Sequence, residues 1–469
     1  MADEASGAGG RFLTGSTLGH VVRMTLSGAA GITFVFVVDA ANLFWLSQLG
    51  EPILMAAIGY AFAVQFFTVS IGVGLMIATT ALVSRSIGRG ERAIAREQGA
   101  AGMLLCFLVQ AATAGLVVLF RHDLLASAGA EGEALDLAAR YVALSMPSLA
   151  VMAVGLCGSA VLRADGLARQ AMMVTMGGGL IMLGLDPLLI YVWGWGLDGA
   201  ALSVWIFRGI MAGLAIWFAA HRNGLLAMPR PALLLRHGPG LLRVALPAII
   251  TQMATPFGNF LLTGFIAMHG DTAVAAWAVI NRLTVVAFGG LFSLAGAIGG
   301  IFGQNFGARQ FDRLRQTYRD AVLFCVVYAA GVWLILMALT GPIARGFGLE
   351  GEGAEVLQAF TQFGALSFTL GGLLFVSNAA FNTLGRPLWA SVQSWLREAV
   401  LMWPVALWLS GVYAAQGVIY AQALVGAVMG VVAGVLGWRY VRGIGEGALP
   451  RVNLRERRAL RDPNRWRRR

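Results

Sequence analysis

The sequence predicts an all-α polytopic membrane protein, with twelve transmembrane helices in two six-helix bundles related by a pseudo-twofold axis along the membrane normal. Three observations lead to this prediction: the composition, an internal repeat and the distribution of arginines. Hydrophobic residues make up 58% of the 469-residue chain, and charged residues only 12%. A soluble protein cannot bury so much apolar surface, whereas a helical membrane protein exposes it to lipid.

Twelve apolar segments have the length of about 20 to 30 residues that lets a helix cross the hydrocarbon. They lie near residues 24–48, 55–84, 98–120, 137–162, 170–194, 197–220, 241–268, 273–303, 320–345, 357–384, 388–411 and 417–441. These spans divide the chain into a cytoplasmic N-terminal segment (1–23), an N-terminal bundle (24–225), a cytoplasmic linker (226–240), a C-terminal bundle (241–441) and a basic cytoplasmic tail (442–469).

The second half of the chain repeats the first at an offset of about 220 residues. ALVSRSIGRGERAIAREQ, which begins at Ala81, is matched by IFGQNFGARQFDRLRQTY, which begins at Ile301. LRADGLARQ, from Leu162, is matched by NTLGRPLWA, from Asn382. Tandem membrane repeats of this size are typical of transporters, in which two bundles move about a site held between them.

The arginines show which side of the membrane each connection faces. One side receives nearly all of them before the tail: Arg85, Arg89, Arg92, Arg96, Arg163, Arg169, Arg222, Arg230, Arg236, Arg243, Arg309, Arg313, Arg315, Arg319 and Arg386. The other side has little more than Arg121, Arg140 and Arg345. The positive-inside rule therefore places both termini in the cytoplasm. The net charge of +11 follows from this topology, so we expect no nucleic-acid partner.

Ionisable side chains inside the spans are the main functional candidates, because each is costly to keep in hydrocarbon. Asp39 lies in span 1, with Asn42 on the same helical face, and Asp186 lies in span 5 directly before Pro187. The position equivalent to Asp39 in the second half is Asn259, which keeps polarity but not charge. We therefore expect a proton or cation site in the first bundle only, formed by Asp39, Asp186 and Asn42.

The alternative is that either aspartate forms a structural ion pair. Arg208, in the middle of span 6, and Arg282, in span 8, are the candidate charge partners. If Arg208 touched either acid, it would hold that acid charged and impair proton cycling. The residues alone leave both interpretations open.

Span 7 carries a polar stripe, which either lines a wet cavity or hydrogen-bonds to a neighbouring helix. We expect a substrate cavity lined by Gln252, Thr255, Asn259 and Thr263, in a stripe that starts at Thr251, and by Asn378, Asn382, Met173 and Met176. Neutral hydrogen-bonding groups beside apolar side chains suit bulky organic molecules, and thioethers adapt to varied ligands, although methionines also serve simple packing. Cys106, Cys157 and Cys325 lie inside spans without metal spacing, and we expect unpaired packing residues there.

Several motifs together resemble the multidrug and toxic compound extrusion (MATE) family. They are the span 1 aspartate, ALVSRSIGRGERAIAREQG after span 2, LRADGLARQ after span 4, LDPLLIYVWGWGLDGAALS across spans 5 and 6, and GQNFGARQFDR after span 8. The resemblance implies a V-shaped pair of six-helix bundles in a bacterial inner membrane. It also implies export of cationic or amphiphilic organic compounds in exchange for protons or sodium, through Asp39 and Asp186.

Two positions depart from the family pattern. Met182 stands where the family commonly has Asn, and Val204 where it commonly has Thr. Because sodium needs several oxygen ligands and a proton needs only a carboxylate, these departures favour protons, with sodium as the alternative coupling ion. We expect no metal site, no cofactor and no enzymatic activity, and a monomer in the lipid bilayer. A flippase for lipid-linked substrates is the alternative transporter. An intramembrane aspartyl protease is a remote alternative, because its Tyr-Asp and Gly-x-Gly-Asp motifs are absent.

Overall fold

The computed structural model describes residues 10–49 and 51–445, and every regular element in these ranges is a helix. The expected basic tail, from residue 446 on, and the first nine residues of the expected N-terminal segment lie outside the described residues. The first half contains α1 (Thr17–Ser47), α2 (Pro52–Gly88), α3 (Arg92–Leu119), α4 (Arg121–Ser127), α5 (Gly132–Ser145), α6 (Ser148–Asp165), α7 (Ala168–Asp186), the π-helix η1 (Pro187–Val192), α8 (Gly196–Ile216) and η2 (Trp217–Arg222).

The second half follows the same plan with more interruptions. It contains α9 (Pro231–Ala267), α10 (Asp271–Gly307), α11 (Phe311–Gly346), α12 (Glu352–Ala359), η3 (Phe360–Gly364), α13 (Ala365–Gly371), α14 (Leu373–Leu384), α15 (Pro387–Trp395), η4 (Leu396–Leu401) and α16 (Met402–Gly443). Helix α9 begins inside the expected linker 226–240, because Pro231 at the first helical position is already set for a helix.

Eleven helical runs in the described part are long and apolar enough to cross a membrane. The last of them, Pro387–Gly443, has 57 residues, far more than the roughly 20 that one crossing needs. It contains a sharp break at Tyr413 and Ala414, where Ala414 has a φ of 50°. The break separates the predicted spans 11 and 12, so the run accounts for two crossings and the helices fit twelve spans.

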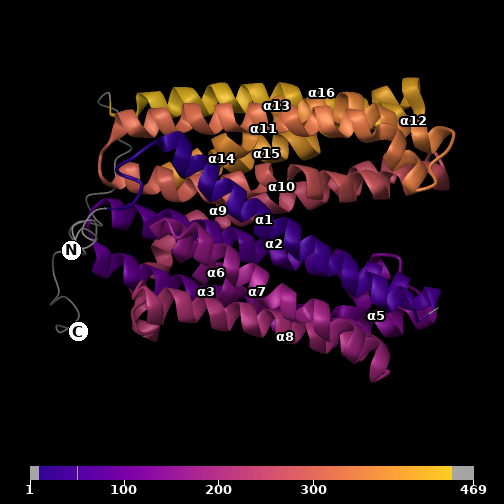
Figure 1. The fold of residues 1–469 in the computed structure, drawn as a ribbon, viewed down its shortest axis with the longest axis horizontal. Coiled ribbons are helices and arrows are strands. Elements are labelled where there is room, and N and C mark those ends of the chain that lie inside the picture. The colour runs from indigo at the N-terminus through magenta and orange to yellow at the C-terminus, as the bar shows by residue number, and fades with distance from the viewer. Residues whose placement is uncertain (1–9, 50, 446–469) are drawn as a thin grey trace.

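The two halves form separate groups of helices that meet at one end and spread apart at the other (Figure 1). Both ends of the described chain lie at the closed end, where Gly10 contacts Gln304 and Gly445 contacts Phe311. Helix α1 packs on both halves. Near its start Thr17 donates a hydrogen bond to Asp320 of α11, and farther along Gly31 faces Thr175 of α7. Helix α1 therefore connects the two bundles.

Glycines let the two bundles approach backbone to backbone at the closed end. A Cβ atom on Gly88 of α2 would lie 2.1 Å from the carbonyl oxygen of Gln304 on α10, and one on Gly307 would lie 2.2 Å from the carbonyl oxygen of Arg85. Gly88 and Gly307 occupy equivalent places in the two halves, as do Arg85 and Gln304, each pair 219 positions apart, one position fewer than the offset of the matched motifs. The contact is thus reciprocal, as expected of an isologous interface. The repeated Gly- and Arg-rich motif builds the interface between the bundles.

The structure brings the side chains of Cys106 on α3 and Cys157 on α6 into contact, which the sequence analysis did not anticipate, whereas Cys325 is buried and free. Helices α3 and α6 pack against each other, and this pairing of faces is not visible in the spacing of the two cysteines along the chain.

Candidate functional site

Asp186 lies at the end of α7 and is fully buried. The helix changes to π geometry at Pro187, which has no N–H to continue the α-helical pattern. The Oδ1 atom of Asp186 accepts a hydrogen bond from the Ser203 hydroxyl of α8. Its Oδ2 atom is also buried and has no hydrogen-bond partner among the described residues. Half of this carboxylate is therefore available to a proton or a cation.

Asp39 and Asn42 of α1 complete the group. The Asn42 side chain is buried beside Asp186, yet its Nδ2 donates no hydrogen bond within the described ranges. Asp39 is half-buried and lies within electrostatic range of Asp186. The Asp39 carboxylate forms no hydrogen bond or ion pair with any residue that the structure describes. The structure thus brings together the three residues that the sequence analysis grouped.

Arg208 of α8 is buried near these acids but does not pair with them. It donates hydrogen bonds to the carbonyl oxygen of Ser145, at 3.0 Å, and to the hydroxyl of Ser148, at 2.6 Å. Asp39 lies within its electrostatic range, without an ion pair between the two in the described chain. Arg282 is exposed on α10. In this conformation Arg208 is held by α5 and α6, so it forms no ion pair with either carboxylate.

The polar residues around Arg208 were not singled out from the sequence. Gln65 of α2 donates a 2.8 Å hydrogen bond to the Ser145 hydroxyl, which links a third helix to the network. Ser203 and the buried Tyr141 belong to the same surroundings. Serine and glutamine are common in spans, so only the three-dimensional arrangement identifies them. A signal was available for Ser203, which lies one residue before the departure at Val204.

The polar stripe of α9 divides between two roles. Thr251 is buried and its hydroxyl lies 3.0 Å from the hydroxyl of Ser391 on α15. Thr263 accepts a 2.9 Å hydrogen bond from the indole of Trp277 on α10. These two threonines connect helices, whereas Thr255 and Asn259 are exposed. The hydrogen-bonding interpretation therefore holds at Thr251 and Thr263, and of the two exposed positions Thr255 lines the pocket described next whereas Asn259 does not.

A pocket of the second bundle contains most of the other polar candidates. It is lined by Gln252, Thr255, Asn378 and Asn382, and Met76 and Thr80 of α2 reach it from the first bundle. It holds about 50 Å³ of water-sized space, much less than the roughly 300 Å³ of a small drug site. In this conformation the pocket therefore accepts water rather than a bulky substrate.

A buried ion pair forms part of the same pocket. Arg397 and Glu398, on the π-helix η4, lie 3.3 Å apart with most of both side chains covered. The Oδ1 atom of Asn382 is buried nearby without a hydrogen-bond partner in the described part of the chain. Sequence analysis did not assign Glu398 to the cavity, although it lies inside the predicted span 388–411. Met173 and Met176, on α7, are exposed and half-buried and do not line this pocket.

Known proteins share this fold over nearly the whole chain. The chain is 26% identical to an FAD transporter of Shewanella oneidensis, over 89% of this chain and 94% of that protein. It is 22% identical to the multidrug export protein MepA of Staphylococcus aureus, over 81% and 84%. The crystal structure of a mutant of the Vibrio cholerae MATE transporter VcmN matches with a TM-score of 0.86, 24% identity and coverage of 92% and 98%.

The family profile described as MatE matches residues 29–188 and 247–408, one segment in each half. Proteins of this family are transporters, which excludes the aspartyl protease and any other enzymatic interpretation. The chain is a multi-pass membrane transporter that belongs to the MatE family, the multidrug and toxic compound extrusion family that its motifs resemble.

Proposed function

We propose that the protein is a secondary active antiporter that exports organic compounds in exchange for protons, through Asp39 and Asp186. The observation that carries this proposal is that both carboxylates lack an ion-pair partner in the described part of the chain. Asp186 is fully buried with one oxygen unpaired, and Asp39 has no counter-ion although Arg208 is near. A buried carboxylate without a cation favours its protonated form, so this group can take up a proton and release it when its surroundings change.

The oxygen atoms around Asp186 support a proton over sodium. Ser203 supplies one hydroxyl and Asn42 an amide group, whereas the neighbouring position Met182 is buried and offers no oxygen. Sodium would need further ligands, which Val204 in place of threonine does not supply. Sodium-coupled export remains the alternative that the experiment below separates.

The closed end of the molecule supports alternating access. The bundles meet near the chain ends and diverge at the opposite end (Figure 1). With both termini in the cytoplasm, as the arginines predict, this conformation is closed to the cytoplasm. Protonation of Asp39 or Asp186 would alter the packing of α1 against α7. Because α1 packs on both bundles, such a change biases the equilibrium between the two access states.

The side chains that line the pocket between the bundles indicate a class of substrate. Amide and hydroxyl side chains beside apolar walls suit cationic or amphiphilic organic compounds, and Glu398 adds a negative charge. Arg397 adds a positive charge to the same pocket, which favours a second candidate. A flavin nucleotide combines a flat aromatic ring with a diphosphate, and a similar protein is named an FAD transporter. The transport panel should therefore contain both classes.

Transport by reconstituted protein tests the proposal. Proteoliposomes should be given an imposed proton gradient, an imposed sodium gradient or neither, with organic cations and FAD as substrates. We expect substrate movement with the proton gradient alone, and loss of that movement in Asp186→Asn. Asp123→Asn makes the same chemical change at an exposed site on α4 and serves as the control. Movement driven only by sodium would contradict proton coupling.

A further inference from the structure

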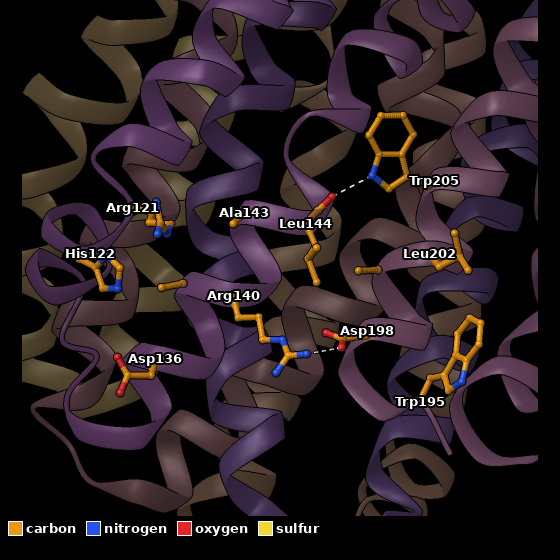
Figure 2. Close-up of a pocket in the computed structure, with 12 residues that line it drawn as sticks. Arg121, His122, Asp136, Arg140, Ala143, Leu144, Trp195, Asp198, Leu202 and Trp205 are labelled. Carbon is orange, nitrogen blue, oxygen red and sulfur yellow. Dashed lines mark hydrogen bonds and ion pairs between the residues drawn. The ribbon is translucent and has the colours of Figure 1, made fainter. Parts of the chain in front are cut away.

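A second pocket lies at the open end of the first bundle, outside the transport site. It holds about 650 Å³ and lies between α4, α5 and α8. Figure 2 shows Arg121, His122 and Asp136 on one side of it and Trp195, Leu202 and Trp205 on the other. The ion pair between Arg140 and Asp198 lies between the two groups. No role in transport assigned above uses these residues.

The pocket faces away from the second bundle. Helix α8 runs along the side of the molecule farthest from α9–α16 (Figure 1), and α5 and α8 pack against helices of the first half. Exposed aromatic residues mark the level of the membrane boundary here, because Tyr191, Trp193 and Trp195 are each exposed over about half of their surface. Aromatic side chains concentrate where lipid headgroups begin. The pocket therefore opens to lipid at the membrane boundary.

Polarity changes along the pocket in the direction of the membrane interior. Arg121, Asp136 and Asp198 stand near the starts of α4, α5 and α8, and Arg140 lies about one turn farther along α5, whereas Leu144 and Leu202 lie deeper and are exposed. The indole of Trp205 donates a 2.8 Å hydrogen bond to the carbonyl oxygen of Leu144, so its ring forms a fixed wall. Trp205 lies nine residues after Gly196, about 13 Å along the helix. The charged side chains at the opening of the pocket are therefore placed to contact a lipid headgroup, and the apolar wall below them is placed to contact an acyl chain.

The charged side chains at the opening of the pocket differ in the contacts that the structure describes. Arg140 pairs with Oδ2 of Asp198, whose Oδ1 is buried without a hydrogen-bond partner in the described part of the chain. Arg121 donates a hydrogen bond to the carbonyl oxygen of Val118 and forms no ion pair among the described residues. Asp136 is exposed and likewise has no ion-pair partner in those ranges. Outside the Arg140–Asp198 pair, Arg121 and Asp136 are a cation and an acid that line the pocket without an ion-pair partner in the described chain, which fits a zwitterion better than an anionic headgroup.

We propose that this pocket binds the headgroup of phosphatidylethanolamine. The lipid phosphate accepts hydrogen bonds from the Arg121 guanidinium, and the primary ammonium group donates to the Asp136 carboxylate. An acyl chain lies over Leu144, Leu202 and the ring of Trp205. A choline headgroup has no N–H to donate to Asp136, and a glycerol headgroup has no cation. The pocket therefore distinguishes phosphatidylethanolamine from the other two lipids.

Native mass spectrometry of the full-length protein tests this site. The protein is released from nanodiscs that contain equal parts of phosphatidylethanolamine, phosphatidylcholine and phosphatidylglycerol. The wild type should retain phosphatidylethanolamine about three- to fivefold over either competitor, the range expected of a partly exposed ion pair. Asp136→Asn should lose the preference over phosphatidylcholine, and Arg121→Gln should lose retention of all three lipids.

Two control variants make the same charge changes outside the pocket. Glu133→Gln lies on α5 and Arg345→Gln lies at the end of α11, both at exposed positions. Both should retain lipid as the wild type does. Preferred retention of phosphatidylglycerol, equal retention of all three lipids by the wild type, or unchanged retention in both Asp136→Asn and Arg121→Gln would overturn the proposal.

Discussion

The guanidinium of Arg85, on α2, donates a 2.5 Å hydrogen bond from Nε to the carbonyl oxygen of Thr383, on α14 of the other bundle. Its counterpart in the second half, Gln304 of α10, donates a 2.6 Å hydrogen bond to the carbonyl oxygen of Ala164 on α6. Ala164 and Thr383 themselves occupy equivalent places in the two halves, 219 positions apart. The two bonds are therefore one interaction made twice about the pseudo-twofold axis, and we expect both to break when this end opens.

Arg85→Gln should open the closed end more often. A hydrogen bond to a charged group contributes about 1.5 to 3 kcal/mol, so its loss should raise the open fraction by roughly tenfold or more. Spin labels at the exposed positions Ala93 and Asp312, one in each bundle, report the distance between bundles by pulsed electron resonance. Arg89→Gln is the control, since Arg89 pairs locally with Glu91. Identical distance distributions for Arg85→Gln and wild type would refute this role.

Gly88→Ala should disrupt the packing of the two bundles at the closed end, because the added methyl group clashes with α10. The new Cβ atom would lie 2.1 Å from the carbonyl oxygen of Gln304, so the backbones must move apart. Overpacking of this kind costs about 1 to 3 kcal/mol. Gly115→Ala is the matched control, because a Cβ atom there meets nothing within 4 Å. Thermal unfolding in detergent should show a lower Tm for Gly88→Ala alone, and equal Tm values would contradict the close approach.

The stripe of α9 should separate into stability and specificity positions. Thr263→Val removes the acceptor of the buried Trp277 indole, which should cost about 1 to 3 kcal/mol and lower the Tm. Asn259→Ala, at an exposed position of the same helix, should leave the Tm unchanged and change the relative export rates of different substrates. If Asn259→Ala lowered the Tm as much as Thr263→Val, the division of the stripe would be wrong.

Much of this architecture could be predicted from the chain because lipid imposes simple rules on it. Span length and the repeat each reflect one such rule, and they predicted the all-helical fold in two bundles, whereas the family was indicated by the resemblance of particular motifs. Helix limits were less predictable: α1 begins at Thr17 and α9 at Pro231, because packing at the closed end continues both helices beyond the hydrocarbon.

The candidate site was only partly predictable for a related reason. A charge in a span is conspicuous, so Asp39 and Asp186 could be selected and their proximity anticipated. Neutral partners such as Ser203 and Ser148 are common in spans and could not be selected. Arg208 was a candidate partner of the acids, and its actual acceptors on α5 and α6 depend on a rotamer that the sequence does not encode locally. The Cys106–Cys157 pair likewise depends on which helix faces meet.

Substrate-induced proton release in detergent tests the central claim most directly. Purified protein in weakly buffered solution receives a substrate identified in the transport panel, and a pH indicator records released protons. Wild type and the Asp123→Asn control should release protons on substrate addition, whereas Asp39→Asn and Asp186→Asn should release none while retaining the wild-type Tm. Undiminished release from correctly folded Asp39→Asn and Asp186→Asn proteins would contradict coupling through the first bundle.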